Sequence, residues 1–439
     1  MAVAWGLLTP AAMDVQRPAA AGRDGIAFAA LTTFAVVMYT IPSMWIEALE
    51  PLRLAFTSSV LAACLMLLRR LVKREPFYFD GTRGLALVAL AALAYVSVQW
   101  TIHPETTRTQ AIEFLKLLAV YLTMVNVIST WRRLMIFAGA IILSSIVTSW
   151  NVITSYHAGE HLVEGYRAGW LGVYADPNHM AMNLMLVIPL AVAFLVRKQT
   201  PWLMRALCVL AGILSVTAIV YSHSRGGFVG LVVAMAVWMF LEKKRRLQTF
   251  VAAFALFIGL VLFAPSSFWQ RNETIGEFHT DASAMGRVYA WEVASQMSAD
   301  NPLLGVGLGG FRYAWPLYAP PEATTAFVAH NVYLDVVGEL GFIGLILFLM
   351  FTGGAAGGVF AASRNSEWGW LANGLAAAVC GYIVCNLFSG YTVSAHFYVL
   401  FALAACADRI ARAETAASKA PEGAGAGVVT QNPWEGARA

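Results

Sequence analysis

The sequence predicts an all-α polytopic membrane protein with about 12 transmembrane helices and a long, partly helical external loop. Of its 439 residues, 59% are hydrophobic and only 12% are charged, whereas a soluble protein carries about twice that charged fraction. The apolar residues also gather into segments of about 20, the length that a helix needs to cross a bilayer. These observations exclude a soluble protein, and the net charge of +4 gives no indication of nucleic-acid binding.

Apolar segments of bilayer length define the expected spans in chain order. They lie near 26–45, 52–69, 84–101, 110–128, 134–152, 179–196, 203–221, 226–242, 248–264, 331–352, 370–388 and 394–411. They divide the chain into an N-terminal segment (1–25), helices 1–9 (26–264), an external loop (265–329), helices 10–12 (330–411) and a tail (412–439). The tail is rich in Ala and Gly and is expected to be disordered.

The distribution of Lys and Arg supports this division, because cytoplasmic segments of membrane proteins are enriched in both. One set of alternating segments, which includes the two termini, holds 21 of the 29 Lys and Arg residues. We therefore expect both termini in the cytoplasm. The opposite set holds seven residues, all of them arginine: Arg53, Arg108, Arg167, Arg225, Arg271, Arg287 and Arg312. Arginine binds phosphate or carboxylate through two parallel hydrogen bonds, so this enrichment suggests anion recognition on the external side.

Two of these arginines stand at the start of predicted helices. Arg225, in "SRGG", begins the eighth span, where its guanidinium group and the free N–H groups of a helix N-terminus would favour phosphate. The alternative is an interfacial arginine beside glycines that allow close helix packing. Arg287 begins an amphipathic loop helix, "SAMGRVYAWEVASQM", with Trp291 one turn later, and a surface arginine stacked on an aromatic ring is the alternative.

Two further segments contain candidate anion ligands. "GYRAGWLGVYADPNH" carries Arg167, and its "DPNH" predicts a turn and a helix N-cap. A metal held by Asp176 and His179 is a weaker alternative, since no other ligand has suitable spacing. Arg108 precedes the fourth span, which contains Glu113 and Lys116 three residues apart. These residues are either part of the same anion site or form a buried ion pair.

The segment "AHNVYLDVVGELG" places titratable groups at the external start of the tenth span. Charged groups at membrane depth are costly, so they usually have a function or a partner. His330, with Asn331 beside it, is either a functional residue or a capping residue at the helix end. Asp335 and Glu339 follow on its face, where they either line an interior cavity or, as we expect, form hydrogen bonds between helices. The preceding "NPLLGVGLGGF" predicts a tight turn, because no βαβ unit surrounds it as a dinucleotide loop requires.

Taken in order, these motifs resemble the O-antigen ligase and O-antigen polymerase superfamily. The resemblance covers roughly residues 160–350, and "HNVYLDVVGELGFIGL" is its most specific element. "YADPNH" and "SAMGR" are also similar to a branch of O-glycosylation ligases found with exosortase systems. The resemblance implies a metal-independent, inverting glycosyltransferase of the GT-C membrane class without cofactors, in the bacterial inner membrane with its active site facing the periplasm.

The resemblance also implies a substrate pair and roles for individual residues. The donor would be a glycan on undecaprenyl diphosphate, and the acceptor a sugar hydroxyl of lipid A–core. Arg225 and Arg287 would hold the donor diphosphate, and His330 would act as the base at the acceptor. Arg167, Arg108 and Asn331 are further candidates for diphosphate binding. Fixed arginines would stabilise the leaving diphosphate, and histidine has a pKa suited to accepting the hydroxyl proton.

Other functions remain open from the sequence. A repeat-unit polymerase or a protein O-oligosaccharyltransferase of the same superfamily would use the same chemistry with another acceptor. A secondary transporter also suits 12 spans with cytoplasmic termini, but such proteins usually contain internal repeats and a binding site near the bilayer midplane. Neither feature is evident here, and the polar residues gather at the external surface instead.

Overall fold

In the computed structural model, residues 24–242, 282–323, 325–365, 367–390 and 392–419 are described. The α-helices in this part of the chain are α1 (Gly25–Thr40), α2 (Leu54–Lys73), α3 (Gly81–Val96), α4 (Pro104–Val127), α5 (Trp131–His157), α6 (Pro177–Met185), α7 (Val187–Val196), α8 (Trp202–Tyr221), α9 (Arg225–Leu241), α12 (Ala282–Asp300), α13 (Phe311–Tyr318), α14 (Val332–Asn365), α15 (Gly369–Cys385) and α16 (Ala395–Lys419). Short 3₁₀ helices are η2 (Pro42–Met44), η3 (Glu47–Leu52), η4 (Ser97–Gln99) and η5 (Gly172–Tyr174). β1 (Leu162–Val163) pairs antiparallel with β2 (Arg167–Ala168).

The helix pattern confirms an all-α polytopic membrane protein. Within the described residues, seven helical segments are long and apolar enough to cross a membrane, and three shorter apolar helices accompany them. Every expected span except one coincides with a helix or helix pair. The exception, 248–264, lies outside the described residues, so the total of 12 spans stays a prediction.

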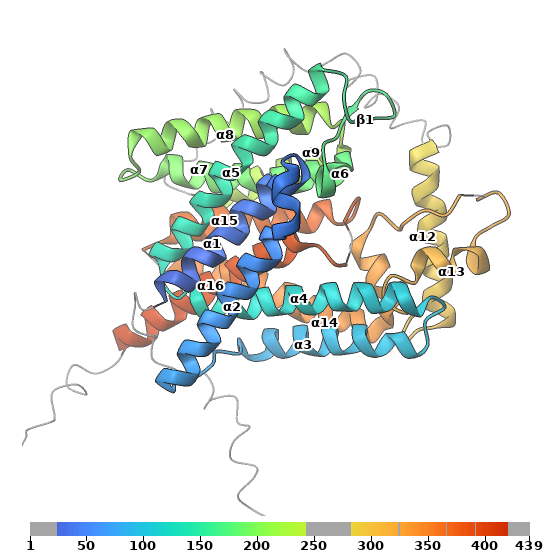
Figure 1. Ribbon diagram of the computed structural model, residues 1–439, viewed down its shortest axis with the longest axis horizontal. Helices are drawn as coiled ribbons and strands as arrows, with labels where there is room; N and C mark the ends of the chain where they lie inside the picture. Colours follow the sequence, from blue (N-terminus) through green and yellow to red (C-terminus); the bar gives the residue numbers. More distant parts are fainter. Residues whose placement is uncertain (1–23, 243–281, 324, 366, 391, 420–439) are drawn as a thin grey trace, which may run out of the picture.

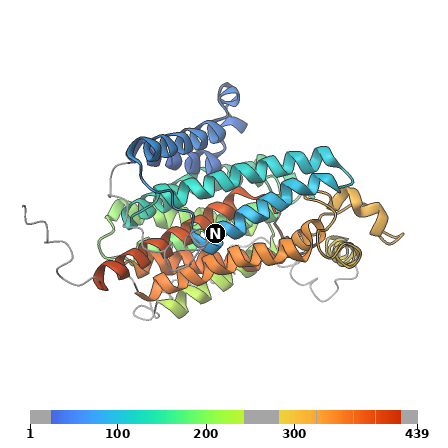
Figure 2. The same ribbon diagram turned by 90° about the horizontal axis from the view of Figure 1, so that it is seen from below.

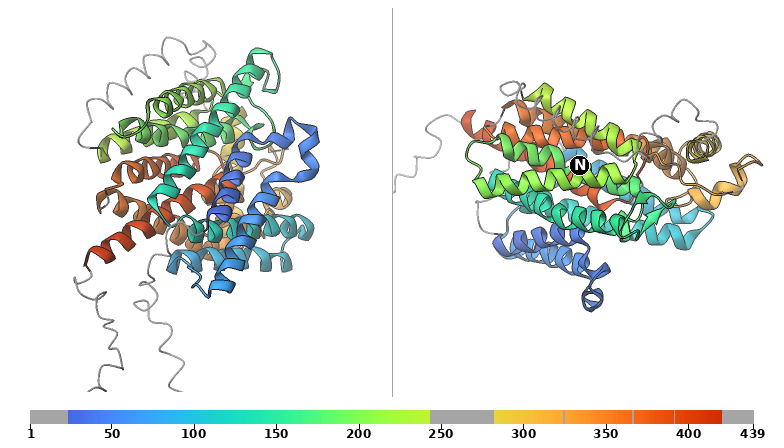
Figure 3. Two further views of the ribbon diagram at one scale, coloured as in Figure 1. Left: turned by 60° about the vertical axis from the view of Figure 1, so that its left-hand side comes forward. Right: turned by 90° about the horizontal axis from the view of Figure 1, so that it is seen from above.

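The helices form one bundle with two different ends. Figure 1 shows α3, α4 and α14 side by side, with α12 and α13 beyond one end of them. We call this the loop end, and β1 and β2 also lie there. The opposite end, where Arg83 and Asp408 lie, is the basic end. The hairpin of α1 and α2 lies along one flank of the bundle (Figures 2 and 3).

α15 and α16 are largely buried in the bundle and are rich in small residues. Small residues let helix backbones approach closely, which drives helix association in lipid. A Cβ added at Gly230 of α9 would lie 2.2 Å from the sulfur of Cys385 and 2.9 Å from the carbonyl oxygen of Gly381, both in α15. α9 and α15 therefore depend on these glycines for their contact.

The sixth expected span consists of two helices, α6 and α7, that meet at Leu186. Pro189 lies in the first turn of α7 and has no N–H group to bond the carbonyl of Met185. The helix therefore divides at this point, and α6 becomes a short, separate element. Its N-terminus at Pro177 lies at the loop end, beside the residues that form the candidate site.

At the basic end, a buried ion-pair network ties α3 to α16. Arg83 contacts Asp80 and Asp408 at 2.7 Å each, and both carboxylates are almost fully buried. Arg412 contacts the other oxygen of Asp408 at 2.8 Å. Tyr121 of α4 also donates to Asp80. α16 continues to Lys419, so residues 412–419, which we expected in a disordered tail, are helical.

At the loop end, α12 confirms the helix expected from "SAMGRVYAWEVASQM" and packs with α13 over a small core of its own. The glycine-rich turn after α12 enters a break in α14, where Gly341 has φ 67° and ψ −172°. Val306 N–H bonds the carbonyl of Gly338, and Phe342 N–H bonds that of Pro302, at 3.0 and 2.7 Å. This docking attaches the loop to the membrane helix.

Candidate functional site

Residues far apart in the sequence meet around His330 at the loop end. The charges of Arg287, Asp176, His179 and Arg167 all act on its imidazole, and effects of this kind arise between neighbouring groups. The site thus combines α12, β2, the start of α6 and the segment before α14. We call these five residues the arginine–histidine site, and it contains three of the six residues predicted from the sequence.

Arg167 is 4% exposed and holds several segments of the site together. Its Nε donates to the carbonyl of Ser222 at 3.1 Å, and a terminal nitrogen donates to Oδ1 of Asn178 at 2.9 Å. A second terminal nitrogen lies 3.5 Å from the carboxylate of Glu164. Arg167 therefore supplies positive charge to the site from a position fixed by α6 and by the turn before α9.

Arg225 is the first residue of α9, as predicted. Ser224 caps the helix by accepting from Gly227 N–H at 3.2 Å, which accounts for the serine of "SRGG". A Cβ on Gly227 would lie 2.5 Å from the Cβ of Ala181 in α6, so this glycine lets α6 and α9 touch. Because Arg167 bonds Ser222, three residues before Arg225, the start of α9 lies next to the arginine–histidine site.

Asp176 is the N-cap of α6, as the "DPNH" motif predicted. Its Oδ1 accepts from the N–H groups of Asn178 and His179 at 2.8 and 2.9 Å. Burial raises the pKa of Asp176, but the charge of His179, the two N–H donors and His330 outweigh it, so the pKa lies below its usual value. Among the described residues no group of three His, Cys, Asp or Glu could hold a metal ion. Asp176 thus supplies a carboxylate charge beside His330.

His330 lies between the loop core and α14 in a left-handed backbone conformation, with φ 49°. Burial, and then the charge of Arg287, lower the pKa of its imidazole to about 4. The ring is therefore neutral at pH 7 and able to accept a proton. Asn331 has a structural role as a cap, because its Oδ1 accepts from the N–H groups of Tyr333 and Leu334 at 3.0 and 3.3 Å.

Arg108 is exposed on the first turns of α4, and within the described chain it makes no hydrogen bond or ion pair. The structure therefore does not join it to the arginine–histidine site. The expected pair of Glu113 and Lys116 does form, at 2.6 Å. Their side chains are 50% and 43% exposed, so the pair is not buried within the protein.

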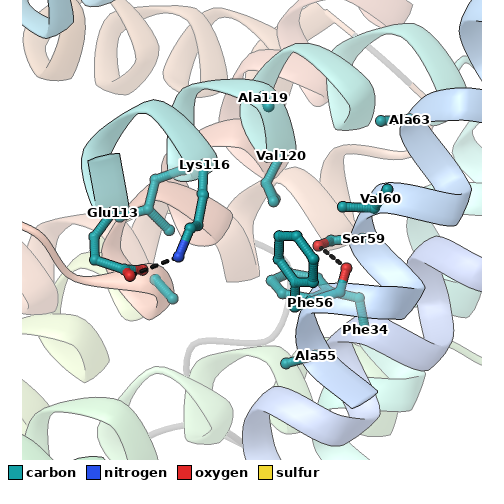
Figure 4. Close-up of a pocket in the computed structure, with 12 residues that line it drawn as sticks. Phe34, Ala55, Phe56, Ser59, Val60, Ala63, Glu113, Lys116, Ala119 and Val120 are labelled. Carbon is teal, nitrogen blue, oxygen red and sulfur yellow. Dashed lines mark hydrogen bonds and ion pairs between the residues drawn. The ribbon is translucent and has the colours of Figure 1, made fainter. Parts of the chain in front are cut away.

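The Glu113–Lys116 pair lines a pocket of about 300 Å³ on the flank of the bundle where α2 lies (Figure 4). The other walls are mostly apolar and come from α1, α2 and α4, with Ala395 from the start of α16. His396, the next residue, is buried, and its Nε2 lies 3.1 Å from the hydroxyl of Tyr174. The pocket therefore borders the start of α16, and His396 in the first turn of that helix contacts Tyr174, two residues before Asp176.

Sequence reasoning missed the contacts that orient the site. Trp291 was read only as a possible stacking partner of Arg287, but its indole N–H bonds the carbonyl of Ala329 at 3.1 Å. The spacing of four residues between Arg287 and Trp291 was the available signal, since it places both on one helix face. His396 and Tyr174 carried no comparable signal, because their contact joins distant segments.

Comparison with known proteins supports the family resemblance that the sequence motifs indicated. The O-antigen ligase family model matches residues 210–349, a range that includes Arg225, Arg287 and His330. The exopolysaccharide production protein ExoQ of Rhizobium meliloti (strain 1021) is 25% identical over 281 residues, which are 60% of this chain and 62% of ExoQ. The match thus spans less than two thirds of that relative's length. Together with the motifs, both comparisons support the similarity of this chain to the O-antigen ligase and polymerase superfamily.

Proposed function

We propose that this protein is an O-antigen ligase of the bacterial inner membrane. It transfers a glycan from undecaprenyl diphosphate to a sugar hydroxyl of lipid A–core at its loop end, which faces the periplasm. The convergence of Arg167, Arg287 and a neutral His330 carries the proposal. Two of these groups attract an anion and the third accepts a proton, which are the two requirements of glycosyl transfer from a diphosphate.

The reaction follows from these groups. The neutral imidazole of His330 removes the proton from the acceptor hydroxyl as its oxygen attacks the anomeric carbon. The bond from that carbon to the diphosphate oxygen breaks, and its electron pair leaves with the diphosphate. Arg287 and Arg225, with Arg167 nearby, stabilise the negative charge that develops there. Attack opposite the leaving group inverts the anomeric configuration, and the arginines supply the charge that a metal ion would otherwise provide.

The pocket of Figure 4 suits part of the carrier lipid. Its walls are largely apolar, and it opens on the flank of the bundle where α2 lies. A polyprenyl chain that leaves the diphosphate must run along the bundle into the bilayer. We propose that a stretch of this chain occupies the pocket between α2 and α4, which would cover the Glu113–Lys116 pair at membrane depth.

A second candidate function is repeat-unit polymerisation. The name of the relative ExoQ concerns exopolysaccharide production, and a polymerase would use the same donor with a second lipid-linked glycan as acceptor. The chemistry at His330 would be unchanged. Only the approach of the acceptor to the loop end would differ.

A transfer assay distinguishes these functions. Protein in nanodiscs receives undecaprenyl diphosphate-linked glycan with EDTA, once with lipid A–core and once without an added acceptor. Glycosylated lipid A–core that disappears in Arg287→Ala and His330→Ala supports the ligase, and longer lipid-linked glycan without acceptor supports the polymerase. Arg312→Ala is the control, because Arg312 is an exposed arginine on α13 at the same end. Absence of both products while the donor is bound would contradict both functions.

A further inference from the structure

The backbone of His330 is strained and must be held by its surroundings. The φ angle of His330, 49°, lies in the left-handed region. This backbone conformation costs a non-glycine residue of order 1 kcal/mol or more. Such conformations persist only where neighbouring contacts determine them. The relevant contacts are therefore those made by the residues on either side of His330.

Ala329, directly before His330, has both of its backbone polar groups engaged by side chains. Trp291 of α12 donates its indole N–H to the carbonyl of Ala329 at 3.1 Å. The Ala329 backbone also interacts electrostatically with the carboxylate of Asp335 in α14. Ala329 is fully buried, and Asp335 is only 7% exposed. The peptide before His330 is thus clamped between the loop helix and the membrane helix.

The residues after His330 are fixed as well. Asn331 caps α14 through its side chain, and Val332 N–H bonds the carbonyl of Asn386 at 2.9 Å. The backbone on both sides of His330 is therefore held by these bonds. The contacts of Ala329 set the direction in which the imidazole points.

Trp291 connects the backbone of Ala329 to the helix that carries Arg287, the arginine proposed to bind the diphosphate. It follows Arg287 by four residues, so the two side chains lie on the same face of α12. The same helix therefore carries the cation and fixes the loop that carries the base. The separation of Arg287 and His330 depends on the bond between Trp291 and Ala329.

The second buried acid of α14 serves a different segment. Glu339 accepts from the N–H of Phe311 at 3.3 Å and from the backbone of Gly309, both in or next to the glycine-rich turn. It holds that turn in the break of α14 and does not contact the segment before His330. Asp335 and Glu339 are thus equally buried, but Asp335 interacts with the segment before His330 and Glu339 with the glycine-rich turn.

We propose, on the basis of the transfer reaction above, that Trp291 and Asp335 are positioning residues that orient His330 toward the acceptor and set its distance from Arg287. Neither side chain takes part in bond making or breaking. A displacement of about 1 Å in a reacting group can lower the rate about 100-fold. Loss of either contact therefore lowers turnover while the arginines still bind the donor.

The test compares Trp291→Phe and Asp335→Leu with matched controls in the nanodisc transfer assay. Trp291→Phe keeps an aromatic ring and removes the N–H donor together with one ring of the indole, a loss of volume that the Trp315→Phe control shares. We expect kcat to fall about 10- to 100-fold, with KM for the donor within twofold. Asp335→Asn keeps an acceptor oxygen and should recover most of the kcat lost in Asp335→Leu.

Two controls separate positioning from general damage to the loop. Trp315 on α13 also donates its indole N–H to a loop carbonyl at 3.2 Å, but that carbonyl belongs to Ala323 and not to a residue adjacent to His330. Trp315→Phe and Glu339→Gln should leave kcat within about threefold, whatever their effect on thermal stability. If Trp291→Phe and Asp335→Leu lower kcat no more than these controls, or weaken donor binding equally, the proposal is wrong. Wild-type transfer that is lost in His330→Ala shows in the same experiment that the proposed function itself holds.

Discussion

The low pKa of His330 predicts that glycan transfer persists down to an unusually low pH. Its imidazole has a pKa of about 4, against an ordinary value of 6.5, and the difference corresponds to about 3 kcal/mol in favour of the neutral ring. At pH 7 only about one molecule in a thousand carries a protonated His330. A base must be neutral to accept a proton, so activity should be lost only when the pH falls through about 4.

The assay is the pH dependence of transfer at low donor concentration, where kcat/KM reports the free enzyme. We expect kcat/KM to stay constant from pH 7 down to about 5 and to reach half its maximum at about pH 4, the pKa of His330. Samples returned from low pH to pH 7 must regain full activity, which excludes irreversible unfolding as the cause.

The pH dependence of kcat should differ from that of kcat/KM in a defined direction. A bound diphosphate brings negative charge close to Arg287, which otherwise lowers the pKa of His330. One unit charge at about 7 Å contributes about 2 kcal/mol at an effective dielectric constant of about 20. The half-maximum of kcat should therefore lie more than one pH unit above that of kcat/KM. A half-maximum of kcat/KM near pH 6.5, or a kcat profile shifted to lower pH, would refute this account of the site.

Three further substitutions test the break in α14, the pocket of Figure 4 and the ion-pair network at the basic end. Gly341→Ala places a Cβ at 2.2 Å from backbone atoms and forces an alanine into φ 67°, so thermal unfolding should show a loss of about 3 kcal/mol or more. Ala63→Trp fills the pocket of Figure 4 and should lower transfer about tenfold from a full-length polyprenyl carrier, and much less from a short-chain analogue, because only the long chain reaches the pocket. Arg83→Met leaves two buried carboxylates without their arginine and should destabilise the protein by about 3–5 kcal/mol in denaturant titrations.

Each substitution has a partner elsewhere in the chain that should have little effect. Gly353 lies in the same helix as Gly341, and nothing lies within 4 Å of an added Cβ, so Gly353→Ala should be neutral or stabilising. Leu67→Trp enlarges a side chain of α2 that is already 46% exposed. Arg412→Met removes a 66% exposed partner of Asp408 and should cost less than about 1 kcal/mol. If a control and its test substitution have the same effect, the contact that the test substitution changes is not the cause of that effect.

Local signals in the sequence were sufficient for the helices and their caps. Hydropathy located the helices because lipid requires long apolar segments whose backbone groups bond within the segment. "DPNH" predicted a helix N-cap because the capping bonds join residues two or three positions apart, whereas the helix start in "SRGG" was expected from hydropathy and the cap by Ser224 was not predicted. Both caps are present, at Asp176 and Ser224.

The arrangement of the site depended on contacts between distant segments, which no local pattern contains. Arg167 was a candidate ligand in the sequence, but its bonds to Ser222 and Asn178 show that it also assembles the site. Asn331 looked like a diphosphate ligand because it follows His330, although its side chain caps a helix. The break at Gly341 was hidden because the turn that packs there lies far earlier in the chain: Val306, for example, precedes its partner Gly338 by 32 residues.

The docked turn also sets the order in which the protein can mature. Synthesis proceeds from the N-terminus, so residues 302–311 emerge before the part of α14 that receives them. Their bonds to residues 338–342 form only after that helix has been inserted. Until then the bonds between this turn and α14 are missing, and the segment that carries His330 is not held against that helix. On the function proposed above, a chain still in the translocon therefore cannot transfer sugar, and the site is complete only once the tenth expected span is in the membrane.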